Sequence, residues 1–130
     1  MRRGWVGWIP AAIWAAVLFF VSNQRSLDVD LSGGLDKVAH FGAYLILGLL
    51  LAAGRVGRTR IFSLILLGSL YGILDEVHQS FVPGRMPDVW DLVADALGVT
   101  FGVLIYYLIR RNLSWSGDAM SAAGAETETT

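Results

Sequence analysis

Long runs without a charged residue divide the chain and predict four membrane-spanning helices. The runs cover residues 4–24, 38–54, 61–74 and 96–109. A bilayer core of ~30 Å needs roughly 20 helical residues, so the last two runs span only if the polar residues beside them lie at membrane depth. A soluble helical protein would show charged residues at helical period, and these runs show none. We predict an all-α, four-helix transmembrane bundle with helices at about 5–22, 36–54, 60–79 and 88–109.

Turn and capping residues separate the predicted helices. Gly34 ends the first loop, after which Asp36 is placed to cap the second helix. The segment 80–87 contains two prolines and a glycine, which favour a tight turn, and Asp88 is placed to cap the fourth helix.

The two ends of the chain differ in character. The first apolar run contains no small-residue cleavage site, so a retained helix is preferred over a removed signal peptide. From residue 112 the composition is rich in Ala, Ser, Gly, Glu and Thr and has no apolar period. We therefore predict a transmembrane domain over 1–111 and a disordered cytoplasmic tail over 112–130.

Composition and charge distribution support a membrane protein and predict its orientation. The sequence is 55% hydrophobic and 16% charged, far from an ordinary soluble composition, and it has no cysteine for disulfides or thiolate ligands. Basic residues gather at one set of helix ends, which places both termini in the cytoplasm. That set is Arg2, Arg3, Arg55, Arg58, Arg60, Arg110 and Arg111, and the opposite set is Arg25, Lys37 and Arg85.

Polar residues in the second, third and fourth helices recur at matched depths. Counting fifteen residues from the cytoplasmic arginine of each helix reaches His40, Asp75 and Asp95. At 1.5 Å per residue this is ~22 Å from the cytoplasmic side. Each of the three has a polar partner four positions away on the same helical face. The partners are Asp36, Gln79 and Asp91. Ionisable groups are costly in lipid, so we expect the three stripes to face one another around an outward-opening pocket.

The predicted pocket contains more acidic residues than basic residues. Its charge can be compensated by protonated carboxyls, by a bound cation such as a divalent metal, or by a cationic part of a ligand, and the sequence leaves these alternatives open. The bases near it are Lys37 and Arg85, with His78 near the interface. The acids are Asp36, Asp75, Glu76, Asp88, Asp91 and Asp95.

Four short motifs lie in order between Asp36 and Gly102. They are Asp36-Lys37-x-x-His40, Asp75-Glu76-x-x-Gln79-x-Phe81, Pro83-Gly84-Arg85, and Asp91-Leu92-x-x-Asp95 leading into Leu97-Gly98. Together they resemble the VanZ-like family of small bacterial membrane proteins. Asp95 departs from the family pattern, which often has asparagine there. The resemblance implies a multi-pass protein of the bacterial cytoplasmic membrane, linked in the founding member of the family to low-level resistance to teicoplanin.

The preferred functional hypothesis is a binding module. A polar pocket at the outer interface can bind the headgroup of an amphiphile such as a lipid, a cell-wall lipid intermediate or a lipoglycopeptide such as teicoplanin. The expected partner is thus a lipid-tailed molecule, and no nucleic acid is expected. The predicted ligand-binding residues are Asp36, Lys37, Glu76, Gln79, Arg85 and Asp91.

Two alternatives stay open. As a hydrolase or transferase acting on a lipid-linked headgroup, with or without a metal ion, the protein would use His40, Asp75 and Asp95 as catalytic residues. No established hydrolase or phosphatase motif is present. As a purely structural protein, it would use the polar residues only to hold helices together. Small residues four apart, such as Gly98 and Gly102, are compatible with dense internal packing or with an oligomer.

Overall fold

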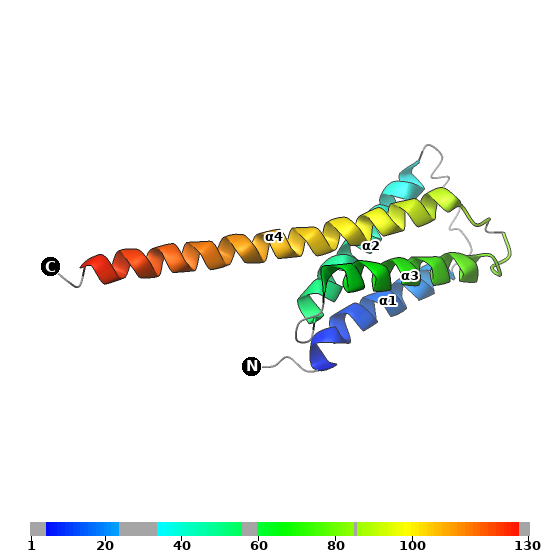
Figure 1. Ribbon diagram of the computed structural model, residues 1–130. Helices are drawn as coiled ribbons and strands as arrows, with labels where there is room; N and C mark the ends of the chain where they lie inside the picture. The colour runs from blue at the N-terminus through cyan, green and yellow to red at the C-terminus, as the bar shows by residue number, and fades with distance from the viewer. Residues whose placement is uncertain (1–4, 24–33, 56–59, 85, 128–130) are drawn as a thin grey trace.

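The protein is a bundle of α-helices in which each helix runs in the opposite direction to the one before it (Figure 1). The computed structural model describes residues 5–23, 34–55, 60–84 and 86–127, with side chains to 113. A short 3-10 helix η1 (Trp5–Trp8) leads directly into α1 (Ile9–Ser22), which is followed by α2 (Leu35–Gly54), α3 (Ile61–Gln79) and α4 (Val89–Thr127). No strand occurs in these ranges. Figure 1 shows that α1 and α3 end, and α2 and α4 begin, at the same end of the bundle.

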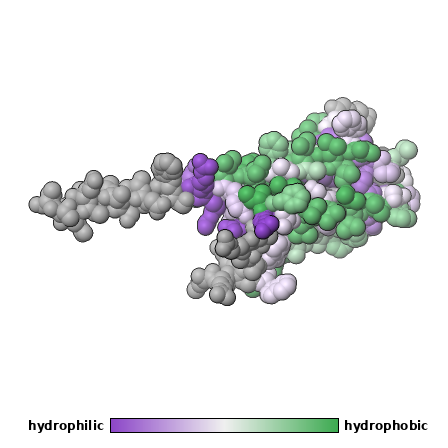
Figure 2. Space-filling view, in the orientation of Figure 1, coloured by the Kyte–Doolittle hydropathy of each residue, from purple (hydrophilic) through white to green (hydrophobic). Residues whose placement is uncertain are grey.

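Four of these segments are long and apolar enough to cross a membrane. They are Trp5–Ser22, Leu35–Gly54, Ile61–Gln79 and Val89–Leu113. Apolar side chains cover most of the bundle face seen in Figure 2. The buried set, by contrast, includes Asp75, Glu76 and Asp95. An apolar surface around buried carboxylates is the arrangement expected of a protein surrounded by lipid. The four predicted spans are thus confirmed, each starting within one residue of its predicted position.

The fourth helix is longer than predicted. It was expected to end near residue 109, but it continues to Thr127, so the tail predicted from 112 begins inside a continuous helix (Figure 1). The sequence after Pro87 contains no further proline, and its alanine, methionine and glutamate residues favour helix. Loss of apolar period therefore marked the end of the membrane-spanning part, and not the end of the helix.

The two predicted caps had different outcomes. Asp88 caps α4 as expected, because its Oδ1 accepts a hydrogen bond from the Trp90 N–H at 2.9 Å. Asp36 does not cap α2. Gly34 occupies the N-cap position with φ of 88°, a left-handed conformation that favours glycine, and Asp36 lies in the first turn.

Glycines allow α2 and α4 to pack with their backbones in contact. A Cβ atom at Gly48 would lie 3.0 Å from the Val99 Cα, and one at Gly98 would lie 3.0 Å from the Leu45 N. A Cβ at Gly102 would overlap the Leu45 carbonyl oxygen. The small-residue spacing therefore serves packing within the chain, the first of the two interpretations left open by the sequence.

The remaining helices pack around this pair. On α3, Gly72 lies against Asp95 of α4, where a Cβ would be 3.2 Å from the Asp95 Cβ. The helix α1 is peripheral: 11% of the residues in its span are buried, against 33% in that of α2. Two interhelical hydrogen bonds fix it, from the Trp14 Nε1 to the Ala43 carbonyl at 2.9 Å and from the Tyr71 hydroxyl to the Ala15 carbonyl at 2.6 Å.

Candidate functional site

The predicted polar stripes meet at the end of the bundle where α2 and α4 begin and α3 ends. The His40 Nδ1 lies 2.9 Å from the Asp95 Oδ1, which joins α2 to α4. Asp95 is only 1% exposed and packs against Gly72 of α3. The expected convergence of the three helices is thus present in the structure. The catalytic or ligand-binding roles of these side chains stay predictions.

Lys37 lies among three carboxylates at the rim of the site. Its Nζ is 2.7 Å from Asp36, 2.8 Å from Asp88 and 3.2 Å from Asp91. An ammonium group has three N–H donors, so each donor has a charged acceptor. Lys37 was predicted to bind a ligand. Here it neutralises its own chain and ties the start of α2 to the start of α4.

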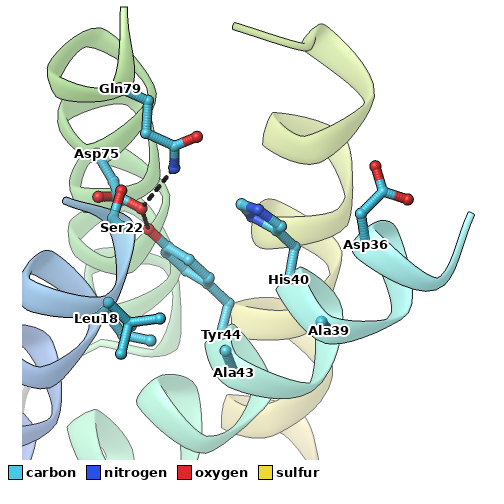
Figure 3. Close-up of a pocket in the computed structure, with 10 residues that line it drawn as sticks. Leu18, Ser22, Asp36, Ala39, His40, Ala43, Tyr44, Asp75 and Gln79 are labelled. Atoms are coloured by element: carbon cyan, nitrogen blue, oxygen red, sulfur yellow. Dashed lines mark hydrogen bonds between the residues drawn. The ribbon is translucent and has the colours of Figure 1, made fainter. Parts of the chain in front are cut away.

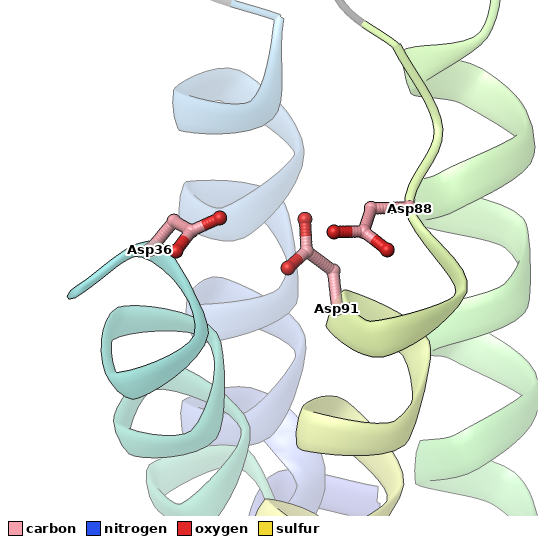
Figure 4. A group of neighbouring side chains, drawn as sticks. All are labelled: Asp36, Asp88 and Asp91. Carbon is pink, nitrogen blue, oxygen red and sulfur yellow. The ribbon is translucent and has the colours of Figure 1, made fainter. Parts of the chain in front are cut away.

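The same three aspartates are the group with metal-ligand spacing in the described part of the chain. Their carboxylates point toward a common centre (Figure 4), and one oxygen of each lies within 4.8 Å of the others. Divalent cations such as Ca²⁺ favour carboxylate ligands of this kind. The Lys37 ammonium takes that position, and it contacts all three carboxylates.

Asp88 sits just before α4 and has two partners that favour its charged form. The Lys37 ammonium lowers the pKa of the Asp88 carboxyl below its usual value, and the Trp90 N–H acts in the same direction. The Asp88 backbone N–H donates to the Glu76 Oε1, which joins the end of α3 to the start of α4. Glu76 thus fixes the turn between these helices with one oxygen. Its Oε2 has no hydrogen-bond partner among the described residues.

His40 lies between Asp91 at the rim of the site and the buried Asp95. One ring nitrogen faces Asp95 at 2.9 Å, and the other, Nε2, lies 3.8 Å from the Asp91 Oδ2. Asp91 in turn bonds Lys37. A carboxylate on a ring nitrogen fixes the orientation and tautomer of an imidazole, which is the arrangement a general base requires. The carboxylates that orient the His40 ring therefore come from α4.

In the described part of the chain, the hydrogen-bond partners of Asp75 are uncharged. Its Oδ2 accepts from the Tyr44 hydroxyl at 3.3 Å and from the Gln79 amide at 3.2 Å. The Oδ1 has no hydrogen-bond partner among the described residues, although Asp75 is only 5% exposed. A buried carboxylate oxygen without a donor is unfavourable, so this atom marks a position where a ligand donor would stabilise the protein.

A cavity of about 250 Å³ adjoins this carboxylate. Figure 3 shows its polar lining residues Asp75 and Gln79 on α3 facing Tyr44 and His40 of α2. The apolar part of the lining consists of Leu18 and Val21 of α1 with Ala39 and Ala43 of α2, and Ser22 and Asp36 complete it.

The cavity differs in position from the predicted pocket. It was expected among the second, third and fourth helices, but α1, α2 and α3 supply the lining residues. Glu76, Asp91 and Asp95 do not line it, and Arg85 lies outside the described residues. Sequence reasoning missed the contribution of α1 and the hydrogen bond of Tyr44. The Ala39 and Ala43 pair, four residues apart beside His40 and Tyr44, was the available signal.

Four apolar spans around a buried polar site define a multi-pass helical membrane protein. A family model described as VanZ/LLP1 matches residues 5–110, which includes all four spans up to the arginines of α4, and the chain belongs to this family. No curated protein and no solved structure matches the chain significantly.

Proposed function

We propose that the protein binds the headgroup of an amphiphile in the cavity between α1, α2 and α3. The observation that carries this proposal is the mixed lining, in which Asp75 and Gln79 of α3 are polar and Leu18 and Val21 of α1 are apolar. Such a lining suits a molecule with a polar end and an alkyl chain. Lipids, cell-wall lipid intermediates and lipoglycopeptides such as teicoplanin are the candidate classes, with envelope maintenance or glycopeptide resistance as the physiological role.

The cavity size limits what enters it. Pockets for drug-sized ligands have volumes of about 300–1,000 Å³, and this cavity has about 250 Å³. A headgroup or a short portion of a larger amphiphile therefore fits, and the rest of the molecule remains in the surrounding lipid. The arginine distribution supports the proposed orientation, with this end of the bundle on the extracytoplasmic side of a bacterial cytoplasmic membrane and both termini in the cytoplasm.

Filling the cavity tests the proposal. Ala39 is exposed and lines the cavity, so we expect Ala39→Phe to add a bulky ring that the fold tolerates and that displaces a ligand. We expect at least ~10-fold weaker binding of amphiphile, measured as lipid retained on purification and by titration in nanodiscs. Ala16→Phe, on an exposed face of α1, is the matched control and retains wild-type binding. Equal binding by the Ala39→Phe variant would rule out this cavity as the binding site.

A second candidate function rests on the His40 and Asp95 pair. An imidazole oriented by a buried carboxylate supports hydrolysis or group transfer on a lipid-linked headgroup, with His40 as general base. If the protein is an enzyme, His40→Gln lowers turnover by about 10²–10⁴-fold while amphiphile binding is retained. Mass spectrometry of headgroup products from lipid-linked substrates provides the measurement. Unchanged product formation in His40→Gln would exclude His40 as the base.

A further inference from the structure

Among the described residues, the carboxylates at this end of the bundle divide into those that contact a basic side chain and those that do not. Lys37 contacts Asp36, Asp88 and Asp91. Among the described residues, His40 contacts Asp95 and also approaches Asp91. The two acids that remain are Glu76, which receives a backbone N–H, and Asp75, which receives only the donors of Tyr44 and Gln79. Of these two, Asp75 is the one that lines the cavity.

The geometry of Asp75 leaves one oxygen for a ligand. In Figure 3 both dashed bonds, from Tyr44 and from Gln79, end on the same carboxylate oxygen. The other oxygen is buried and has no partner among the described residues. Gln79 donates through its amide nitrogen, which leaves its amide oxygen as a further acceptor on a residue that lines the cavity. The polar part of the lining therefore contains acceptors for an incoming donor.

We propose that the headgroup bound here carries a primary ammonium, with Asp75 as its counter-ion and the alkyl chain of the same molecule beside Leu18 and Val21. This inference rests on the proposed function, because it names the ligand class of the same cavity. A primary ammonium supplies both a positive charge for Asp75 and an N–H donor for its Oδ1, which has no donor among the described residues. A hydroxyl headgroup supplies only the donor, and a quaternary ammonium supplies only the charge.

A divalent cation suits this position less well than an ammonium. Such ions favour several carboxylate oxygens at once. In the described part of the chain, the carboxylates with metal-ligand spacing are those around Lys37, and Asp75 is not among them. The neighbours of Asp75 are instead a phenol and a primary amide, which bind N–H groups readily.

Single-chain lipids that differ only in the headgroup test the inference on the intact protein in nanodiscs. The probes are lysophosphatidylethanolamine, lysophosphatidylcholine and lysophosphatidylglycerol with the same acyl chain. We expect the ethanolamine lipid to bind at least ~10-fold more tightly than the other two. Glycerophosphoethanolamine, which has the same amine but no chain, separates a soluble amine from a lipid and is expected to bind weakly. Equally tight binding of this chainless compound would overturn the assignment of the alkyl chain to α1.

A substitution then connects the preference to Asp75. Asp75→Asn preserves the shape but removes the charge, so we expect it to lose the preference for the ethanolamine lipid while still binding the glycerol lipid. Asp88→Asn removes a carboxylate at the same end that does not line the cavity, and it is expected to keep the preference. Melting temperatures verify that both variants fold. The ligand comparison on the unmodified protein is decisive even if Asp75→Asn is unstable.

The outcomes separate this inference from the function on which it rests. If the three lysolipids bind the unmodified protein equally, and Ala39→Phe abolishes that binding, the proposed preference for a primary ammonium is wrong and the cavity is the amphiphile site. If none binds, or if Ala39→Phe has no effect, both proposals fail. A preference for the ethanolamine lipid that survives in a folded Asp75→Asn variant would overturn the role of Asp75.

Discussion

Replacing Gly102 by alanine is expected to push α2 and α4 apart and to lower the free energy of unfolding by about 1–3 kcal/mol. The added Cβ would overlap the Leu45 carbonyl oxygen and would lie 2.9 Å from the Leu49 N and 3.1 Å from the Gly48 Cα. All three are backbone atoms, so no side-chain rotation can relieve the contact. Thermal unfolding in detergent, followed by circular dichroism, measures the loss.

Gly42→Ala is the matched control. Gly42 lies in the same helical pair, on α2, but no atom would be within 4 Å of its added Cβ. Alanine favours helix over glycine by roughly 0.5–1 kcal/mol, so this variant should be at least as stable as the unmodified protein. Because α2 and α4 also hold the His40 and Asp95 pair, Gly102→Ala should disturb the contact between these two side chains as well. A Gly102→Ala variant of unchanged stability would show that α2 and α4 are not packed this closely.

The membrane-spanning elements were predictable because lipid imposes a simple requirement on sequence. A span must be about 20 residues long, so extending the uncharged runs by the polar residues beside them located α2 and α3 to within one residue at each end. The end of α4 was not predictable by the same rule. Beyond Leu113 the helix is no longer an apolar span, and its continuation to Thr127 depends on local propensity instead of polarity.

The matched depths of the polar residues were informative because successive helices run in opposite directions and each rises by a similar distance per residue. Counting from the arginines put His40 level with Asp95, and these two side chains do form a pair. Counting also put Asp36 level with Asp91, and Lys37 joins them. Depth alone determines which layer a residue occupies, and the cost of a charge in lipid determines that it faces the bundle.

The position of the cavity could not be deduced from the same information. The sequence of α1 is apolar on every side, so no stripe indicates that Leu18 and Val21 line the cavity. The partners of Lys37 were equally unpredictable from the sequence, because three nearby aspartates were available to bind a ligand, a metal ion or a lysine. Only the packing of α2 against α4 brings Asp36, Asp88 and Asp91 around one ammonium group.

Replacing Lys37 by glutamine is expected to make the stability of the protein depend on calcium. Without the ammonium, the carboxylates of Asp36, Asp88 and Asp91 keep oxygens within 4.8 Å of one another but lose their shared counter-ion. Their repulsion should lower the melting temperature by several degrees in a chelator. Added Ca²⁺, which binds clusters of carboxylate oxygens, should restore much of the loss. A calcium titration of the melting temperature measures both effects.

Arg60→Gln removes a positive charge at the start of α3, at the far end of the bundle, and controls for net charge. It should leave the melting temperature insensitive to calcium, as should the unmodified protein, in which Lys37 occupies the centre of the three carboxylates. If Lys37→Gln is as stable as the unmodified protein in chelator, the three carboxylates do not converge on Lys37. If calcium fails to stabilise a destabilised variant, these carboxylates do not form a divalent site when the lysine is removed. Lys37 would then hold α2 to α4 only as a pairwise ionic contact, and Asp75 would remain the acidic residue through which this end of the bundle could recognise a cation.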